Sequence, residues 1–296
     1  MNDQHQTIRR DDEAFPELLA HLQDPPEELY VLGDIDALHL PSLAIVGSRN
    51  PTRTGARNAH EFASFLGEAG FCIVSGLAQG IDAAAHRGAL DAGAPTVAFL
   101  GTGIDRVYPA ANRDLAHKIA RNGALVSEFP LGTNPDKWHF PRRNRLISGL
   151  SLGTIVIEAA RRSGSLITAR LAAEQGREVF ALPGSIHNPL ARGCHQLIRS
   201  GAKLVETGED IVAELEPLVG HMLQAGNAST DEAKKPFVHD GEYGDLLKVL
   251  DHDPSSIEFL AEQSGLTIDQ VSSMLLILEL EGKVEALSGG RYTLLS

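Results

Sequence analysis

The residue types best suited to chemistry in this sequence gather in the segment 137–145, KWHFPRRNR. One lysine and three arginines supply cations for phosphate groups, and Trp138 and Phe140 supply rings on which bases can stack. Cations interleaved with aromatic rings are the combination that holds a single-stranded nucleic acid. Pro141 suits the start of a helix that carries Arg145. A structural alternative stays open here, in which the rings belong to the core and the arginines pair with carboxylates.

The distribution of charge along the chain also favours a polyanionic partner. The formal net charge is −13, but residues 41–205 carry 19 basic and 11 acidic side chains. Residues 1–40, 206–236 and 237–296 have net charges of −8, −5 and −8. A basic middle section suits nucleic acid, whereas acidic ends suit protein partners and limit nonspecific binding to DNA. Solvated arginines on helix surfaces would produce the same count, so charge leaves both explanations open.

Composition and length restrict the class of protein. With 43% hydrophobic and 22% charged residues among 296, the chain is typical of a globular protein with one larger and one smaller domain. The N-terminus lacks the apolar segment of a signal peptide, and no apolar run approaches the roughly 18 residues of a membrane span. The two cysteines, Cys72 and Cys194, indicate a reducing cytoplasm. We expect no membrane association and no cofactor. We also expect no metal site, since neither CxxC nor HExxH occurs.

Short apolar runs alternate with helical patterns between residues 41 and 206. Strands with little polar alternation, separated by helices, form parallel sheets that are covered on both faces. The sequence therefore predicts an α/β domain with a doubly wound, mostly parallel, Rossmann-like sheet. The expected strands are 43–47, 71–76, 95–101, 124–128, 154–159, 178–184 and 203–206.

Glycine-rich loops follow four of these strands, at the edge of the sheet where such folds bind their ligands. Glycine lets backbone amides approach a ligand closely, and the N-termini of the helices that follow attract anions. Turns need glycine in any case, so no single loop is diagnostic, but several at one edge suit phosphate groups. The loops are VGSRN (46–50), SGLAQGID (75–82), GTGID (101–105) and SGSLITA (163–169).

The C-terminal part has the pattern of a second domain. It contains a helix–turn–helix pattern with Gly265 in the turn, followed by a short hairpin, which is typical of a winged helix. We divide the chain into an N-terminal extension (1–40), the Rossmann-like domain (41–215), a polar linker (216–236) and the winged-helix domain (237–296).

The second helix of that pattern, expected at 267–282, would be the DNA-reading helix of a winged-helix transcription regulator. It holds no lysine or arginine, and carries Asp269, Glu279 and Glu281 instead. A helix that reads DNA needs cations for phosphates and donors for base edges. We therefore expect this domain to contact protein, with the regulator as an alternative function.

Motifs for nucleotide binding and nucleophilic catalysis are weak or absent. The chain has no Walker A loop, and GTGIDR (101–106) lacks the third glycine of a dinucleotide fingerprint. GLSLG (149–153) matches GxSxG around Ser151, but it follows an expected helix and precedes an expected strand. A nucleophile elbow has the opposite order. We interpret the match as a coincidence and expect no enzymatic activity.

Several longer motifs occur in an order that closely resembles one known family. They are VGSRNPTRTG, SGLAQGIDAAAH, GTGIDRVYPAAN, SEFPLG, HFPRRNRLISGLS, VIEAARRSGSLITARLAAEQGREVFALPGS and GCHQLIRSGAKLV. Together they resemble the DNA-processing protein A family (DprA, also called Smf) over roughly residues 16–210. The C-terminal domain is similar to the winged helix that many members carry. Many members also have a preceding helical domain, for which this chain has too few residues.

The resemblance implies that the chain binds single-stranded DNA without strong sequence preference and forms a homodimer. In this family the protein protects incoming DNA and helps to load the RecA recombinase during natural transformation. Carried over by motif, Arg49, Lys137 and Phe140 contact DNA. The same pocket is lined by Arg142, Arg143, Asn144 and Arg145, and donors to phosphate come from Gly47, Ser48, Gly164, Ser165 and Thr168.

Spacing and edge arguments add two expectations of our own. Arg53 and Arg57 lie one turn apart on the helix after GSRN and would extend the basic track. The strand 203–206 has the character of an edge strand, and exposed edges pair with other strands. We expect the dimer to form there, and the candidate interface residues are Ile198, Leu204 and Val205.

A nucleotide-processing enzyme is the strongest alternative. Phosphoribohydrolases with a related Rossmann-like fold carry a PGGxGTxxE signature, which GLSLGTIVIE (149–158) faintly resembles. The double glycine is missing, and Glu158 lies one residue too far from Thr154. That shift would turn the carboxylate to the other side of the strand, since side chains alternate between the two faces.

Overall fold

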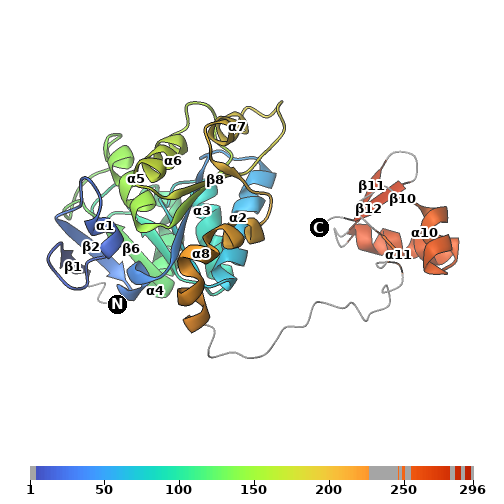
Figure 1. Cartoon of the computed structure of the whole chain (residues 1–296), viewed down its shortest axis with the longest axis horizontal. Coiled ribbons are helices and arrows are strands. Elements are labelled where there is room, and N and C mark those ends of the chain that lie inside the picture. The colour runs from blue at the N-terminus through green and yellow to red at the C-terminus, as the bar shows by residue number, and fades with distance from the viewer. Residues whose placement is uncertain are drawn as a thin grey trace. The chain divides into compact units, whose positions relative to one another are not determined.

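A computed structural model of the chain describes residues 5–226, 246, 249–250, 255–280, 284–287 and 291–294. The chain divides into two compact units, Met1–Ser229 and Thr230–Ser296, which are described separately (Figure 1). None of the described helices has the length and apolarity that crossing a membrane requires.

The larger unit is built on a mixed sheet, nine-stranded within the described residues, in the order β1-β2-β6-β5-β4-β3-β7-β8-β9. The strands from β3 to β9 run parallel, which confirms the predicted α/β class. Its strands are β1 (Gln6–Arg9), β2 (Glu28–Gly33), β3 (Ser42–Gly47), β4 (Cys72–Ser75), β5 (Thr96–Phe99), β6 (Gly123–Ser127), β7 (Gly153–Ile157), β8 (Glu178–Ala181) and β9 (Lys203–Leu204).

The order of the strands reverses beside β3. The chain winds from β3 through β4 and β5 to β6 in one direction, and β7 then returns to the other side of β3. Doubly wound sheets bind their ligands at such a switch point, outside the carboxyl ends of the strands. The fold thus places the ends of β3 and β7, and the loops after them, at the expected ligand edge.

Helices cover both faces of the sheet (Figure 1). Neighbouring strand residues alternate between the two cores: Val46 faces the core under α5 and α6, while Ile45 faces the core under α2 and α3. This double burial explains why the strands read as continuous apolar runs. The helices are α1 (Glu17–Ala20), α2 (Arg53–Glu68), α3 (Ile81–Asp91), α4 (Arg113–Asn122), α5 (His139–Leu150), α6 (Ser165–Glu174), α7 (Arg192–Arg199) and α8 (Gly208–Gly226), with 3-10 turns η1 (Asp36–His39) and η2 (Ala110–Asn112).

The part of the predicted N-terminal extension (1–40) that the structure describes belongs to the sheet of the larger unit. In the described part, β2 pairs antiparallel with β6, and β1 pairs antiparallel with β2. Leu29 and Val31 are fully buried in the same core as α5. The N-terminal segment therefore continues the sheet beyond β6 instead of preceding it.

The boundary between domains also differs from the prediction. The linker predicted at 216–236 begins as helix, because α8 continues to Gly226 with Pro217 inside it. The remainder of that linker lies outside the described residues.

The smaller unit has the predicted helix–turn–helix and hairpin. α10 (Ile257–Ser264) ends at Gly265, whose φ of 72° is left-handed, and α11 (Ile268–Leu280) follows. The strands β10 (Ser255–Ser256), β11 (Val284–Leu287) and β12 (Arg291–Leu294) form a small antiparallel sheet.

The segment of this unit before α10, residues 237–254, falls mostly outside the described residues. Of its residues, Leu246 and Leu250 are buried in the core of the unit. Among the acidic residues of the expected DNA-reading helix, Glu279 is exposed on α11, while the side chain of Asp269 and all of Glu281 lie outside the described part.

A buried histidine under α3 makes the stability of the larger unit depend on pH. His86 Nδ1 lies 2.7 Å from Thr96 Oγ1, and the Thr96 hydroxyl donates at 2.6 Å to the carbonyl of Ile73. Nδ1 must therefore carry a proton, and the buried Nε2 has no hydrogen-bond partner among the described residues, which favours the neutral ring. Burial lowers the pKa of His86 to about 3.

We expect the free energy of unfolding to decrease as the pH is lowered below 6.5. In this range His86 takes up a proton in the unfolded chain but stays neutral in the folded chain. The loss at pH 5.5 relative to pH 7.5 is about 1.4 kcal/mol from this residue, since each unit of pKa difference is worth about that amount. Urea unfolding at both pH values measures it. The His86→Gln variant should lose this part of the dependence, and an unchanged dependence in that variant would contradict the assignment.

Candidate nucleic-acid interface

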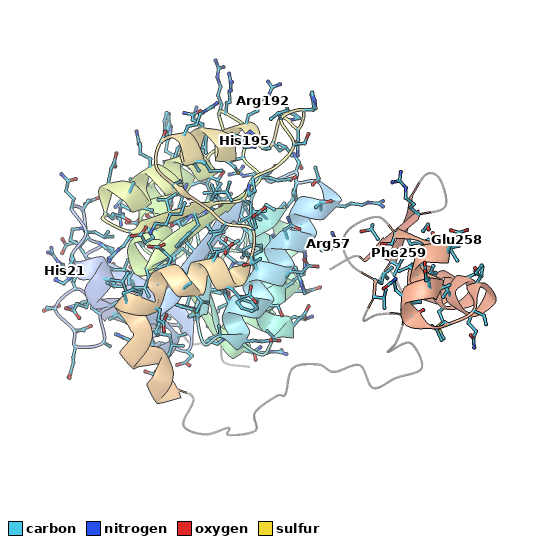
Figure 2. All side chains as sticks on the ribbon, turned by 45° about the vertical axis from the view of Figure 1, so that its right-hand side comes forward. His21, Arg57, Arg192, His195, Glu258 and Phe259 are labelled. Atoms are coloured by element: carbon cyan, nitrogen blue, oxygen red, sulfur yellow. The ribbon has the colours of Figure 1, made fainter. Side chains whose placement is uncertain are left out.

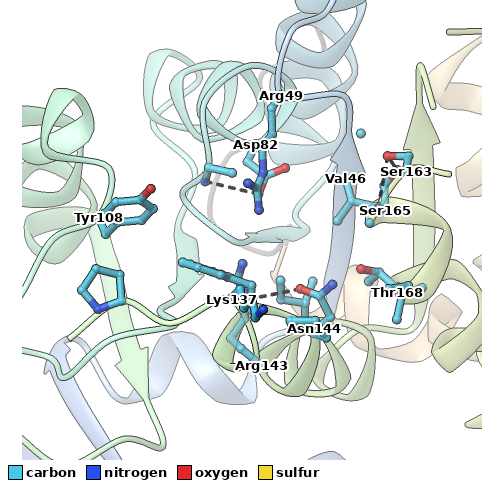
Figure 3. A pocket seen from close by; sticks show the side chains of 18 of the residues that line it. Val46, Arg49, Asp82, Tyr108, Lys137, Arg143, Asn144, Ser163, Ser165 and Thr168 are labelled. Atoms are coloured by element: carbon cyan, nitrogen blue, oxygen red, sulfur yellow. Dashed lines mark hydrogen bonds between the residues drawn. The ribbon is translucent and has the colours of Figure 1, made fainter. Parts of the chain in front are cut away.

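A cavity of about 660 Å³ opens at the switch point of the sheet (Figure 3). Its walls come from the end of β3, the start of α3, the first half of α5 and the start of α6. The fold brings together here most of the residues expected to contact DNA. Those that line the cavity are Gly47, Arg49, Lys137, Phe140, Arg143, Asn144, Gly164, Ser165 and Thr168.

Arg143 forms the floor of the cavity and is almost fully buried, with 4% of its surface exposed. Its Nη1 donates to the carbonyl oxygen of Gly76 at 2.7 Å and also to that of Phe99. Its Nε donates to Asn144 Oδ1 at 3.3 Å. We had expected Arg143 to contact phosphate, but these bonds hold the protein's own loops.

Asp82 is buried near enough to Arg143 for the opposite charges of the two side chains to act on one another. The amides of Gly76 and Ala78 donate to Asp82 Oδ2 at 3.2 and 3.3 Å. Burial raises the pKa of Asp82 above its ordinary value, and the positive charge of Arg143 opposes that rise. Burial likewise lowers the pKa of Arg143 to about 10, so its guanidinium stays charged at neutral pH. Arg143 ties α5 to the loop after β4 through the carbonyl of Gly76, and Asp82 binds the amide of the same residue.

Arg49 and Phe140 meet at one side of the cavity. The guanidinium carbon of Arg49 lies 5.6 Å from the centre of the Phe140 ring, within the range of a cation–π contact. Tyr108 lies on the same ring, with its centre 5.7 Å from that of Phe140. Phe140 thus presents a ring to the cavity. Trp138, the other candidate for stacking, is 71% exposed outside it, with Lys137 Nζ 5.0 Å from its ring centre.

The N-terminus of α6 closes the opposite side of the cavity (Figure 3). Ser163, Gly164 and Ser165 line the cavity here, and Ser163 Oγ lies 2.7 Å from Ser165 Oγ. Backbone amides and hydroxyls at the start of a helix attract anions. Together with Arg49 and Lys137, this end of α6 makes the cavity a site for negatively charged groups.

Two of the predicted arginines point away from the cavity. On α5, Arg142 Nη2 lies 3.2 Å and Arg145 Nη2 lies 2.5 Å from the same oxygen of Glu128. Residues three apart share one face of a helix, whereas Phe140, Arg143 and Asn144 occupy the other face. Burial raises the pKa of Glu128 above its ordinary value, and the two arginines oppose that rise.

The other predicted residues outside the cavity lie on the loop after β3 and on α2. The amide of Ser48 donates at 2.7 Å to the carbonyl of Glu158. Arg53 is exposed at the first residue of α2. Arg57 points outward from the same helix (Figure 2), and its Nε lies 3.7 Å from Glu61.

Two residues that line the cavity were not identified from the sequence. Asp82 and Tyr108 line the cavity, and both lie in motifs that we quoted, SGLAQGIDAAAH and GTGIDRVYPAAN. An acidic residue in the first turn of a helix after a glycine-rich loop was the available signal for Asp82. A pattern of cations and rings does not by itself reveal the carboxylate that balances their charge.

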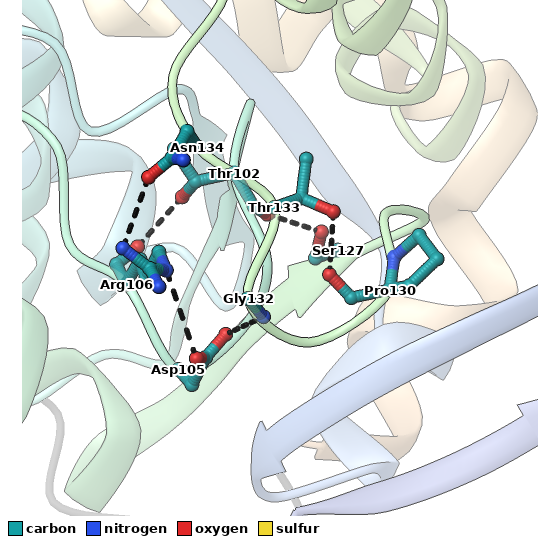
Figure 4. A network of polar contacts seen from close by, with 8 residues as sticks. All are labelled: Thr102, Asp105, Arg106, Ser127, Pro130, Gly132, Thr133 and Asn134. Atoms are coloured by element: carbon teal, nitrogen blue, oxygen red, sulfur yellow. Dashed lines mark hydrogen bonds and ion pairs between the residues drawn. The ribbon is translucent and has the colours of Figure 1, made fainter.

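The GTGID loop has a structural task rather than a place in the cavity (Figure 4). Asp105 accepts a hydrogen bond at 2.8 Å from the amide of Gly132, and Arg106 Nη1 donates at 3.0 Å to Asn134 Oδ1. The amide of Gly103 donates to the carbonyl of Thr133 at 3.1 Å. This loop braces the segment after β6, which leads into Lys137.

The residues of the two enzyme alternatives are engaged elsewhere. Ser151 is fully buried, and its hydroxyl donates at 2.9 Å to the carbonyl of Ile147 in α5. Glu158 does not line the cavity, and its carboxylate binds Thr52. Neither side chain is placed to react with a group bound in the cavity.

The candidate dimer residues differ in exposure. β9 lies at the end of the sheet, and Leu204 on it is 49% exposed. Ile198 is half-buried against the core. Val205 is 1% exposed and packs in the core with α8, so its prediction as an interface residue is wrong.

We expect Arg143→Ala to lower the free energy of unfolding by about 3–5 kcal/mol, because it leaves the carbonyls of Gly76 and Phe99 without their donor and removes the positive charge that acts on buried Asp82. The matched control is Arg142→Ala, which removes an arginine that is 59% exposed and should cost less than about 1 kcal/mol. Urea unfolding followed by circular dichroism gives both values. Equally small losses of unfolding free energy in the two variants would show that Arg143 does not hold the cavity together.

Comparison with known families and structures matches both units. Residues 6–216 match the family described as DNA recombination-mediator protein A, and residues 230–290 match the DprA winged helix domain. Protein Smf of Escherichia coli (strain K12) is 43% identical over 289 residues, which cover 97% of this chain and 76% of that protein. DNA processing protein DprA of Streptococcus pneumoniae is 48% identical over 205 residues, covering 69% of this chain and 72% of that protein.

Solved structures agree with this result. The X-ray structure of DprA from Streptococcus pneumoniae superposes with a TM-score of 0.69 at 47% identity, covering 71% of this chain and 74% of that one. A structure of DNA processing protein A from Helicobacter pylori, which gives insights into its unique single-stranded DNA binding mode, superposes with a TM-score of 0.66 at 32% identity. That match covers 73% of this chain and 97% of the other. The fold, the ordered motifs and these matches together show that the chain belongs to the DNA recombination-mediator protein A (DprA/Smf) family.

Proposed function

We propose that this protein binds single-stranded DNA, without strong sequence preference, in the cavity at the switch point of the sheet. The observation that carries the proposal is the lining of that cavity, which combines the cations of Arg49 and Lys137, the ring of Phe140 and the N-terminus of α6. Single-stranded DNA offers both phosphates and unstacked bases, and this lining suits both. The single-stranded DNA binding mode described for the Helicobacter pylori relative supports it.

Each side of the cavity has a task in this proposal. Arg49 and Lys137 attract phosphate groups, and the amides and hydroxyls of Gly164, Ser165 and Thr168 donate to them. Gly47 lets the backbone come close to the strand, and Asn144 adds an amide donor. Contacts of this kind read phosphate and sugar rather than base identity, which accounts for a weak sequence preference.

Preference for single strands follows from Phe140. Its ring lines the cavity while Arg49 and Tyr108 hold it in place. A ring inside a cavity reaches a base only if that base is free of its partner, as in a single strand. Duplex DNA keeps its bases stacked and would leave only the phosphate contacts.

We also propose the wider role that the family implies. The protein protects incoming DNA, loads the RecA recombinase onto it during natural transformation, acts as a homodimer, and does so in the cytoplasm where RecA works. The exposed edge at β9 supports the dimer, and the exposed Glu279 on α11 supports a winged helix that contacts protein. The engagement of Ser151 and Glu158 within the fold supports a binding protein rather than an enzyme.

The test is fluorescence anisotropy with a labelled oligo-dT strand and the matching duplex, across a salt series. We expect the single strand to bind more tightly, with affinity that falls steeply with salt. Arg49→Ala and Lys137→Ala should each weaken binding about tenfold, which corresponds to about 1.4 kcal/mol.

Two other arginines serve as controls for charge. Arg170 pairs with Glu174 on the exposed side of α6, and Arg142 faces Glu128, so their alanine variants should bind within about twofold of the wild type. Equal losses in all four variants would show that binding depends on total charge rather than on the cavity. Absence of single-strand binding at low salt would remove the proposed function.

The dimer is tested by light scattering. We expect a mass of twice the 31.7 kDa of one chain. Leu204→Asp places a charge on the exposed edge and should shift the protein to the monomer, whereas Leu218→Asp, at another exposed leucine, should not. A monomeric wild type, or a dimer that tolerates Leu204→Asp, would contradict the interface at β9.

A further inference from the structure

Glu158 combines an unusual backbone with an unusual set of partners. It follows β7 directly and has a φ of 51°, in the left-handed region that residues other than glycine rarely adopt. Its carbonyl oxygen accepts a hydrogen bond at 2.7 Å from the amide of Ser48. A strained residue of this kind persists where the surrounding structure holds it in place, and it marks positions with a task.

The carboxylate of Glu158 binds the start of α2. Its Oε2 accepts at 2.8 Å from the amide of Thr52, and its Oε1 accepts at 2.6 Å from the Thr52 hydroxyl. Asn188, from the loop after β8, donates at 3.4 Å to the same Oε1. Gly55 makes room for this arrangement, because a Cβ there would lie 2.4 Å from the carboxyl carbon of Glu158.

A helix cap alone does not explain these contacts. Thr52 already caps α2, since its hydroxyl accepts at 2.9 Å from the amide of Gly55. Glu158 reaches this cap from 106 residues away in the sequence. It therefore joins the loop after β7 to the loop after β3, and Asn188 joins the loop after β8 to both.

The segment between the two contacts carries Arg49. Glu158 holds Ser48 at one end through its backbone and Thr52 at the other end through its side chain. Arg49 lies between these points, with its guanidinium over Phe140 in the cavity. One residue thus fixes both ends of the loop that presents a cation to the ligand.

We propose that Glu158 is a positioning residue for single-stranded DNA: it holds residues 48–52 so that Arg49 faces the cavity, and it does not touch the DNA itself. The inference rests on the proposed function of the cavity.

The sign of the effect separates this role from simple electrostatics. Replacing Glu158 removes a negative charge near a site for a polyanion. If Glu158 acted only through its charge, it would repel DNA, and its removal would strengthen DNA binding. A positioning role predicts the opposite, because the loss of the carboxylate frees Arg49.

The main variant is Glu158→Asn, since asparagine tolerates a left-handed backbone but is too short to reach Thr52. We expect it to bind oligo-dT about five- to tenfold more weakly than the wild type, with the reduced salt dependence of Arg49→Ala. Glu158→Gln keeps an acceptor at full length and should stay within about threefold. The control is Asp210→Asn, which removes a carboxylate that accepts from the amides of Glu206 and Thr207 at 2.9 Å, outside the cavity. It should bind as the wild type does.

A double-mutant cycle with Arg49→Ala completes the binding test. In the Arg49→Ala background, Glu158→Asn should cause no further loss, because the residue that it positions is already gone. Losses that multiply, or unchanged or tighter binding by Glu158→Asn alone, would overturn the proposal. If Arg49→Ala itself binds as the wild type does, the proposed function of the cavity fails instead.

A second measurement tests the positioning without DNA. Trypsin cleaves after Arg49 only when the loop 48–52 opens, and the released loop of Glu158→Asn should be cut there at least several times faster than in the wild type. Asp210→Asn should be cut at the wild-type rate. Equal rates for Glu158→Asn and the wild type would show that the carboxylate does not hold this loop.

Discussion

The buried guanidinium of Arg143 is the contact on which the cavity depends. It binds the carbonyl of Gly76, just after β4, and the carbonyl of Phe99, the last residue of β5, and the negative charge of Asp82 acts on it. Both carbonyl groups lie at the ligand edge of the sheet, so this one side chain fixes α5 against two strand ends. This attachment decides which face of α5 turns toward the cavity. Phe140 and Asn144 turn toward the cavity, while Arg142 turns toward Glu128.

The three arginines of FPRRNR therefore perform different tasks although they are neighbours in sequence. Arg143 organises the floor of the cavity, and Arg142 and Arg145 neutralise Glu128, a carboxylate whose side chain is 2% exposed. The cations that line the cavity with free access come from elsewhere, at Arg49 and Lys137. The positive charge of these three arginines thus stabilises the fold beside the cavity instead of attracting the ligand directly.

The sequence predicted the parallel sheet well, because strands buried on both faces leave continuous apolar runs. It also predicted most of the cavity, since glycine loops and motifs at strand ends meet at one edge. It did not predict which way each arginine points. Helical spacing shows which residues share a face, but which face turns toward the cavity is decided by the packing of the helix on the sheet. The same limit applies to Val205, which is buried by α8, and to β2, whose pairing with β6 depends on a partner nearly a hundred residues away. The left-handed backbone of Glu158 leaves no local trace in residue types.

The two ends of the sheet differ in a way that bears on assembly. At one end, β1 is a four-residue strand that ends in Arg9 and is followed by Arg10, Asp11 and Asp12, and charges of this kind discourage further strand pairing. At the other end, β9 is short and carries the exposed Leu204. If two copies pair through β9, like ends of the two sheets meet about a two-fold axis. Such an association closes after two subunits and cannot grow into a filament.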